Sequence, residues 1–106
     1  RASWVADYPD AQNYLSLFFG NNFTPNGPNY THFKNAKFDS VYIKSMSESN
    51  LEKRIDLYKK MDRIVLENAP VVVLFYDEVL RFTQKNIEGL GINPINLLEL
   101  KNVKKN

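Results

Sequence analysis

The segment from residue 49 to residue 76 constrains the fold of this chain more than any other. Its first two thirds place apolar side chains about 3.5 residues apart, which is the spacing of one face of an α-helix. These side chains are Leu51, Ile55, Tyr58, Met61 and Val65. Ser49 and Glu52 have the spacing of a capping box at a helix start, and Pro70 cannot continue a helix. The pattern therefore predicts one helix over residues 50–67.

An uninterrupted run of apolar and aromatic residues, 71–76, follows this helix. β-branched and aromatic residues favour strands, and a run without polar residues is typical of a strand covered on both faces. We therefore predict a central strand there. The helix residues expected to face inward beside it are Ile55, Tyr58, Met61 and Val65.

The N-terminal part of the chain predicts a strand followed by a helix. Residues 1–7 alternate weakly between polar and apolar, and Pro9 marks a turn. The carboxylate of Asp10 can accept the unpaired amide hydrogens of a first helical turn, so we expect a helix over residues 11–19.

Residues 21–31 are rich in Asn, Pro and Gly and show no periodicity, which predicts a surface loop with aromatic anchors at Phe23 and Tyr30. Asn35 is suited to cap a second helix that ends near Ser47. Its apolar stripe comprises Phe38, Val41, Tyr42 and Met46. Weaker patterns predict strands at residues 79–84 and 97–103. Helices and strands mix without strict alternation, so the predicted fold class is α+β.

Length, charge and composition exclude several kinds of protein. A chain of 106 residues has room for one core of ordinary size. The net charge is +2, and positive charge is concentrated only in the short tail at residues 101–106, which is too little for nucleic-acid binding. The absence of cysteine excludes disulfides and thiolate zinc sites. The longest apolar run is far shorter than a membrane span of about 20 residues.

Catalytic and metal sites have little support in the sequence. His32 is the only histidine, and no serine-elbow motif accompanies it, so a structural role is expected and a small hydrolase has only this residue in its favour. Asp7, Asp10 and Asn13 are oxygen ligands three residues apart, but they lack the glycine and the distant carboxylate of a calcium loop. We expect no catalytic residue, no metal and no cofactor.

The segment from Trp4 to Tyr8 has a different character. Asp7 follows a predicted strand, with an indole three residues before it and a phenol directly after it. A carboxylate in such surroundings can hold a ligand ammonium in a partly dry pocket. The alternative is that Asp7 only caps the turn at Pro9, and composition alone favours this alternative.

Several motifs resemble, in order, those of the bacterial extracellular solute-binding proteins of the oligopeptide and dipeptide family (family 5). Residues 4–15 resemble the family segment W-x-A-D-Y-x-D-P-x-x-F-L, and Asn29-Tyr30 followed by Phe38-Asp39 resembles its N-Y and F-D step. Residues 54–58 and 68–76 resemble its R-x-x-x-Y helix and A-P-x-x-P-L-Y-Y strand, and the Gly89 region resembles its V-x-G-L turn. The departures are Ala11 and Val73, which stand where the family commonly has proline.

The resemblance implies a C-terminal fragment, residues 1–106, of a longer, two-lobed periplasmic-binding-protein-like receptor. Residues 1–70 would form part of the ligand-side lobe, and residues 71–106 would return toward the other lobe. The family pattern places ligand binding at four residues. These are Trp4, Ala6, Asp7 and Tyr8. Asp7 would bind the α-ammonium of a peptide, and Trp4 would flank the peptide backbone.

The function implied by the resemblance is the substrate-binding component of an ABC importer, which captures peptides and delivers them to membrane permease subunits. It would be periplasmic, or a lipoprotein anchored outside the cytoplasmic membrane, and it would not be an enzyme. One alternative is a receptor for a non-peptide solute such as a nickel complex or a sugar. The other is a sensory or interaction module without a transport role.

A lobe separated from its neighbours would leave apolar surface exposed. We therefore expect the isolated chain to cover that surface by self-association or domain exchange. Sedimentation at increasing protein concentration should show species larger than the monomer. A monodisperse monomer that binds no dye specific for apolar surface would contradict this expectation.

Overall fold

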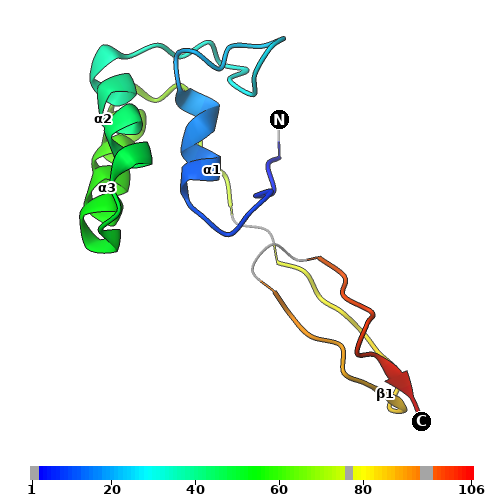
Figure 1. Ribbon diagram of the computed structural model, residues 1–106. Helices are drawn as coiled ribbons and strands as arrows, with labels where there is room; N and C mark the ends of the chain where they lie inside the picture. The colour runs from blue at the N-terminus through cyan, green and yellow to red at the C-terminus, as the bar shows by residue number, and fades with distance from the viewer. Residues whose placement is uncertain (1–2, 76–77, 94–96) are drawn as a thin grey trace. The chain divides into compact units, whose positions relative to one another are not determined.

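The computed structural model describes residues 3–75, 78–93 and 97–106 (Figure 1). The chain divides into two compact units, the first ending at Val73 and the second beginning at Leu74. The helices of the first unit are α1 (Gln12–Leu15), the 3₁₀-helix η1 (Ser16–Phe18), α2 (Ala36–Ser47) and α3 (Leu51–Asn68). The described strands of the second unit are β1 (Ile87–Glu88) and β2 (Lys104–Lys105).

Helix α3 confirms the strongest sequence prediction, but its cap differs from the expected one. Asn50, not Ser49, is the N-cap, and its side-chain oxygen accepts the Lys53 backbone amide at 3.0 Å. The carboxylate of Glu48 in turn accepts the Asn50 amide at 2.9 Å. The helix ends at Asn68, one residue after the expected end, and is followed by Ala69 in the left-handed conformation (φ 45°). The stop therefore lies just before Pro70, where a helix cannot continue.

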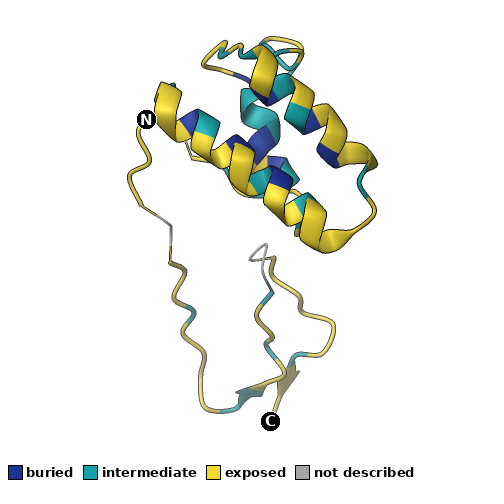
Figure 2. Ribbon diagram, turned by 90° about the vertical axis from the view of Figure 1, so that its left-hand side faces the viewer, coloured by how far each residue is buried: buried dark blue, intermediate teal, exposed yellow. Residues whose placement is uncertain are grey.

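Helices α2 and α3 pack against each other, and α1 packs against α3. The buried positions lie along these helices in Figure 2. The core cluster comprises Leu15, Phe38, Tyr42, Met61 and Val65. Aromatic rings complete it, since Phe19 stacks on Tyr42 with ring centroids 4.5 Å apart and Phe18 meets Phe38 edge to face at 6.4 Å.

Three residues predicted to be part of the apolar faces are exposed. Ile55 is 40% exposed, Leu51 is 60% exposed and Met46 is 67% exposed. At 3.6 residues per turn, Ile55 lies about 120° around α3 from the fully buried Met61, so it falls on the flank of the buried face. Leu57 is buried instead. The predicted inward orientation of Ile55 is therefore wrong, whereas that of Met61 and Val65 is confirmed.

The loop between η1 and α2 is organised around a buried polar residue. Asn29 is fully buried, and its side-chain amide donates to the carbonyls of Phe19 (3.1 Å) and Phe33 (2.9 Å). Its side-chain oxygen accepts the Thr31 hydroxyl at 3.0 Å. Tyr30, one of the two predicted anchors, is 75% exposed, so that prediction is wrong. The loop is held by hydrogen bonds from the buried Asn29 side chain, whose polar atoms need partners once they leave water.

Most of the predicted strands are absent from the described residues. Residues 3–7, 71–75, 79–84 and 97–103 have no strand structure, while residues 1, 2 and 76 of these predictions lie outside the described part. The side chains at 71–75 are exposed, Val72 by 81%, so they are not covered on both faces. An apolar run becomes a central strand only where neighbouring strands pair with it. No such neighbour is present among the described residues.

The observed sheet is one short antiparallel pair, with Ile87 opposite Lys105 and Glu88 opposite Lys104. Gly89 follows with φ 80°, and a Cβ atom there would meet the Asn102 carbonyl oxygen, so the position requires glycine. Among the described residues, helix therefore exceeds strand, and the α+β prediction holds only in part. The predicted division at residue 70 into parts of two lobes stays a prediction.

Replacing Asn29 should test whether its hydrogen bonds hold the loop. Asn29→Asp keeps the size of the side chain but turns a charged oxygen toward two carbonyls, which should lower the free energy of unfolding by about 3 kcal/mol or more. Denaturant unfolding measures the change. Asn21→Asp, the same substitution at an exposed position, should stay within about 0.5 kcal/mol. Equal effects of the two substitutions would contradict the role of Asn29.

Candidate functional site

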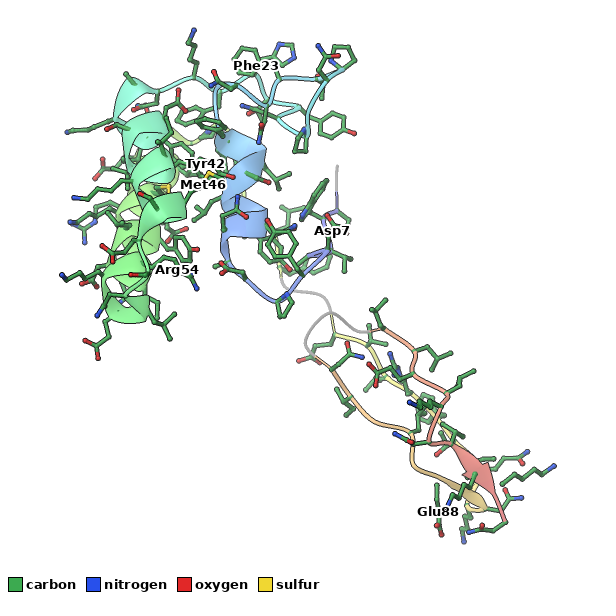
Figure 3. All side chains as sticks on the ribbon, in the orientation of Figure 1. Asp7, Phe23, Tyr42, Met46, Arg54 and Glu88 are labelled. Carbon is green, nitrogen blue, oxygen red and sulfur yellow. The ribbon has the colours of Figure 1, made fainter. Side chains whose placement is uncertain are left out.

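Trp4 and Asp7 are brought together by a side chain of α1. Figure 3 labels Asp7 in the segment that precedes this helix. The Trp4 indole Nε1 donates to Asn13 Oδ1 at 2.6 Å. The Asn13 Nδ2 donates to Asp7 Oδ2 at 3.4 Å. Asn13 is only 3% exposed, whereas Asp7 is exposed and Trp4 is half-buried. The arrangement holds an accessible carboxylate beside an indole ring.

Tyr8 is also tied to α1. Its hydroxyl donates to Gln12 Oε1, and Gln12 Nε2 donates to the hydroxyl oxygen of Tyr42 in the core. Burial raises the pKa of Tyr42, the Gln12 hydrogen bond lowers it, and nearby Tyr8 raises it further, so the net pKa is raised. Ala6 is half-buried between these anchored neighbours in the chain. The four predicted ligand-binding residues thus lie in one segment that two α1 side chains hold.

The carboxylate of Asp10 links this segment to α3. It accepts the Gln12 backbone amide at 2.9 Å and the Tyr58 hydroxyl at 2.8 Å, and it pairs with the Arg54 guanidinium at 3.3 Å. Arg54 and Tyr58 are four residues apart, so they share a face of the helix. Burial alone would raise the pKa of Asp10, but the two hydrogen bonds and the Arg54 charge outweigh it, and the pKa is lowered.

These contacts join two of the family-like motifs, residues 4–15 and residues 54–58. Asp10 was expected to cap the first helical turn. Its carboxylate does accept the Gln12 amide, but the N-cap residue of α1 is Ala11, which has no side-chain capping bond. The contacts of Asp10 with Arg54 and Tyr58 and the bridging role of Asn13 were not predicted. The signals were present as a carboxylate and an R-x-x-x-Y pair in separate segments, and only the tertiary fold shows that they meet.

Comparisons with known proteins support the resemblance to the peptide-binding proteins. No family model matches the chain. The dipeptide-binding protein of Escherichia coli is 22% identical over 94% of this chain, and the oligopeptide-binding protein OppA of Bacillus subtilis is 29% identical over 85%. A probable deoxycholate-binding periplasmic protein of Escherichia coli is 26% identical over 89%. The chain is a distant homologue of the bacterial dipeptide- and oligopeptide-binding proteins.

This homologue of the peptide-binding proteins spans only 16–19% of the length of the three relatives. They are solute-binding proteins, which are not enzymes, and this agrees with the expectation that the chain is not an enzyme. None of the helices in the described ranges combines the length and the apolar character that a membrane span requires.

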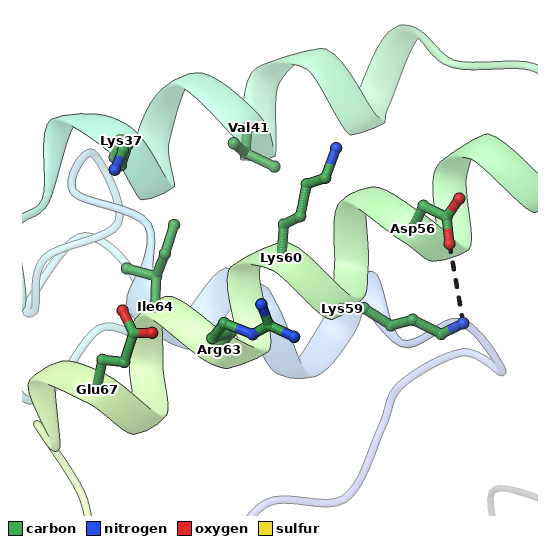
Figure 4. Close-up of a pocket in the computed structure, with 8 residues that line it drawn as sticks. All are labelled: Lys37, Val41, Asp56, Lys59, Lys60, Arg63, Ile64 and Glu67. Carbon is green, nitrogen blue, oxygen red and sulfur yellow. Dashed lines mark ion pairs between the residues drawn. The ribbon is translucent and has the colours of Figure 1, made fainter.

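One hollow of the first unit has no lining residue from the Trp4 and Asp7 segment. Figure 4 shows this shallow depression of about 550 Å³ along α2 and α3. Its lining residues are Lys37, Val41, Asp56, Lys59, Lys60, Arg63, Ile64 and Glu67. Asp56 and Lys59 are 3.8 Å apart, and both side chains are mostly exposed, so solvent screens their pairing. We interpret this depression as the solvated face of the helix pair.

The two other kinds of site considered, a histidine site and a metal site, have less support. His32 stacks on Phe23 with ring centroids 4.8 Å apart, and its Nε2 lies 3.0 Å from the Thr24 hydroxyl. In the described part of the chain, no group of three potential metal-ligating side chains lies close enough together to hold an ion. Among the described residues, the segment from Trp4 to Tyr8 therefore remains the strongest candidate site of this homologue of the peptide-binding proteins.

The contact between Tyr58 and Asp10 should be visible in an alkaline titration. Burial, followed by the hydrogen bond and charge of Asp10, raises the pKa of Tyr58 to about 12. Because this is above the ordinary value of 10.0, the contribution to stability is present below pH 10 and is lost as pH rises through about 12. Tyrosinate absorbance should show a step near pH 12 that Tyr58→Phe removes.

Tyr14→Phe, at an exposed tyrosine, should leave that step in place. Persistence of the step in Tyr58→Phe would show that another tyrosine is responsible and would contradict the assignment.

Proposed function

We propose that the chain is part of the substrate-binding component of an ABC importer and that it captures peptides outside the cytoplasmic membrane. The observation that carries this proposal is the exposed Asp7 carboxylate held beside Trp4 through Asn13. Homology to dipeptide- and oligopeptide-binding proteins supports it. Delivery of the peptide would require membrane permease subunits as partners.

Asp7 and Trp4 offer complementary chemistry to a peptide N-terminus. The indole N–H is the only hydrogen-bond donor of that ring, and Asn13 already accepts it, so Trp4 presents apolar surface to a ligand. Asp7 offers an exposed carboxylate whose contact with Asn13 is long, at 3.4 Å. A carboxylate gains most from a cation when water is excluded, which closure of two lobes would achieve. Tyr8 and Ala6 would complete the contact segment.

The location proposed for this receptor is outside the cytoplasmic membrane, in a periplasm or on a lipid anchor. Two of the relatives are named as periplasmic proteins, one binding deoxycholate and one binding murein peptide. These names support a role outside the cytoplasmic membrane. The lipid anchor is a proposal only.

A receptor for a non-peptide solute is the second candidate. The relative named for deoxycholate, which is 26% identical, favours it because deoxycholate carries a carboxylate and has no ammonium group. An anionic solute would gain nothing from Asp7, so the two candidates differ in what they require of this residue. Neither a sensory nor an interaction role is named for any of the relatives above.

The Asp7 carboxylate can be tested in the complete receptor with two peptides that differ only in N-acetylation. Asp7→Asn keeps the shape and removes the charge, so affinity for the free-amine peptide should fall by roughly 2–5 kcal/mol, the usual loss when one partner of a buried charge pair is removed. The acetylated peptide should bind the native receptor weakly. Asp7→Asn should reduce the difference in affinity between the free-amine and the acetylated peptide. Calorimetry on the four combinations gives the coupling energy.

Asp62→Asn provides the matched control, because it makes the same change at an exposed position of α3. It should leave both affinities unchanged. Additive effects, with Asp7→Asn distinguishing the two peptides as strongly as the native receptor does, would show that Asp7 only caps the turn.

A further inference from the structure

We propose that Asn13 is a positioning residue that fixes Trp4 and Asp7 relative to each other. The expected effect of Asn13 on ligand affinity rests on the function proposed above. The expected effect of Asn13 on the position of Trp4 rests on the hydrogen-bond geometry alone. Asn13 was not among the residues expected to bind a ligand.

A side-chain amide is suited to this role because it carries an acceptor and a donor at a fixed separation. Asn13 uses both, the oxygen toward the Trp4 indole at 2.6 Å and the nitrogen toward the Asp7 carboxylate at 3.4 Å. It is 3% exposed, so either group would be costly to leave unpaired. Any rotation of the amide would weaken both contacts together.

The backbone of Asn13 is itself firmly held. Its amide donates to the Asp10 carbonyl at 3.1 Å, and its carbonyl accepts the Ser16 hydroxyl at 2.7 Å. Asp10 is joined to α3 through Arg54 and Tyr58, as described above. Asn13 therefore anchors residues 3–7, which have no regular secondary structure, to the helical core.

This placement has a direct consequence for binding. Residues 3–7 contain no helix or strand to order them, so without Asn13 a ligand would have to order Trp4 and Asp7 as it binds. Ordering side chains on binding reduces affinity, and a site that is already ordered avoids that loss. The long 3.4 Å contact also leaves Asp7 with acceptor capacity for a ligand cation.

Trp4 is the only tryptophan in the chain, so its fluorescence reports this contact without a ligand. In Asn13→Leu the indole loses its acceptor, and we expect a red-shifted emission and acrylamide quenching that rises about twofold as the segment opens locally. Asn13→Asp keeps an acceptor oxygen for the indole but turns a second carboxylate toward Asp7, which it repels. Its emission should therefore stay closer to that of the native protein than the emission of Asn13→Leu does. Asn21→Leu, at an exposed asparagine, is the control and should change neither.

A second measurement keeps the proposal testable if Asn13→Leu loses its helical circular dichroism. The single indole Nε1–H gives one signal in a nitrogen–proton correlation spectrum. In Asn13→Asp its acceptor becomes charged, which strengthens the hydrogen bond, so the proton signal should move downfield. An unmoved signal, or Asn13→Leu fluorescence identical to the native protein, would overturn the positioning role.

Calorimetry with a free-amine peptide then tests the effect on the site in the complete receptor. Affinity should fall about tenfold in Asn13→Leu and stay unchanged in Asn21→Leu. If Asp7→Asn weakens binding but Asn13→Leu does not, the role of Asn13 in binding is overturned. If fluorescence changes as expected while the native receptor binds no peptide, the positioning of Trp4 is supported and the proposed function is overturned.

Discussion

The carboxylate of Asp10 is the point on which the arrangement of the first unit depends. It receives the start of α1 through the Gln12 amide and binds α3 through Arg54 and Tyr58. Without it, the N-terminal segment would be joined to the helical core through the Gln12 hydrogen bond to Tyr42 and the apolar contacts of Leu15 and its neighbours. Hydrogen bonds and an ion pair to one carboxylate give the segment a defined direction, which apolar packing alone does not.

The helices could be predicted from the sequence because their signals are local. Periodicity, a cap and Pro70 identified α3, and the same kind of signal with Asn35 as the cap identified α2. The strand predicted at residues 71–76 has no such local signal, because an apolar run becomes a strand only through pairing with other segments. The sequence indicates that these residues favour burial, but it does not identify the segment that would cover them.

Buried polar residues were the harder part of the site to predict. Asn13 lies in a predicted helix and Asn29 in a predicted loop, and neither was predicted to be buried. Asn13 bonds to Trp4 and Asp7, and Asn29 bonds to the carbonyls of Phe19 and Phe33. Their importance depends on which carbonyls and donors surround them after folding. The family-like motif at residues 4–15 predicts roles for Asp7 and Trp4, and in the structure Asn13 joins these two side chains.

The joint between the N-terminal segment and α3 consists of Asp10, Tyr58 and Arg54. The pKa values of Asp10 and Tyr58 are displaced in opposite directions, each away from neutral pH. The pKa of Asp10 is lowered from its ordinary value of 3.8, and that of Tyr58 is raised from 10.0. Asp10 contributes stability above pH 3.8 and loses it as pH falls through its lower native pKa, whereas Tyr58 behaves in the opposite sense at the alkaline end. Between these limits the joint keeps one protonation state, so acidification of the surroundings within that range leaves the anchoring of the N-terminal segment intact.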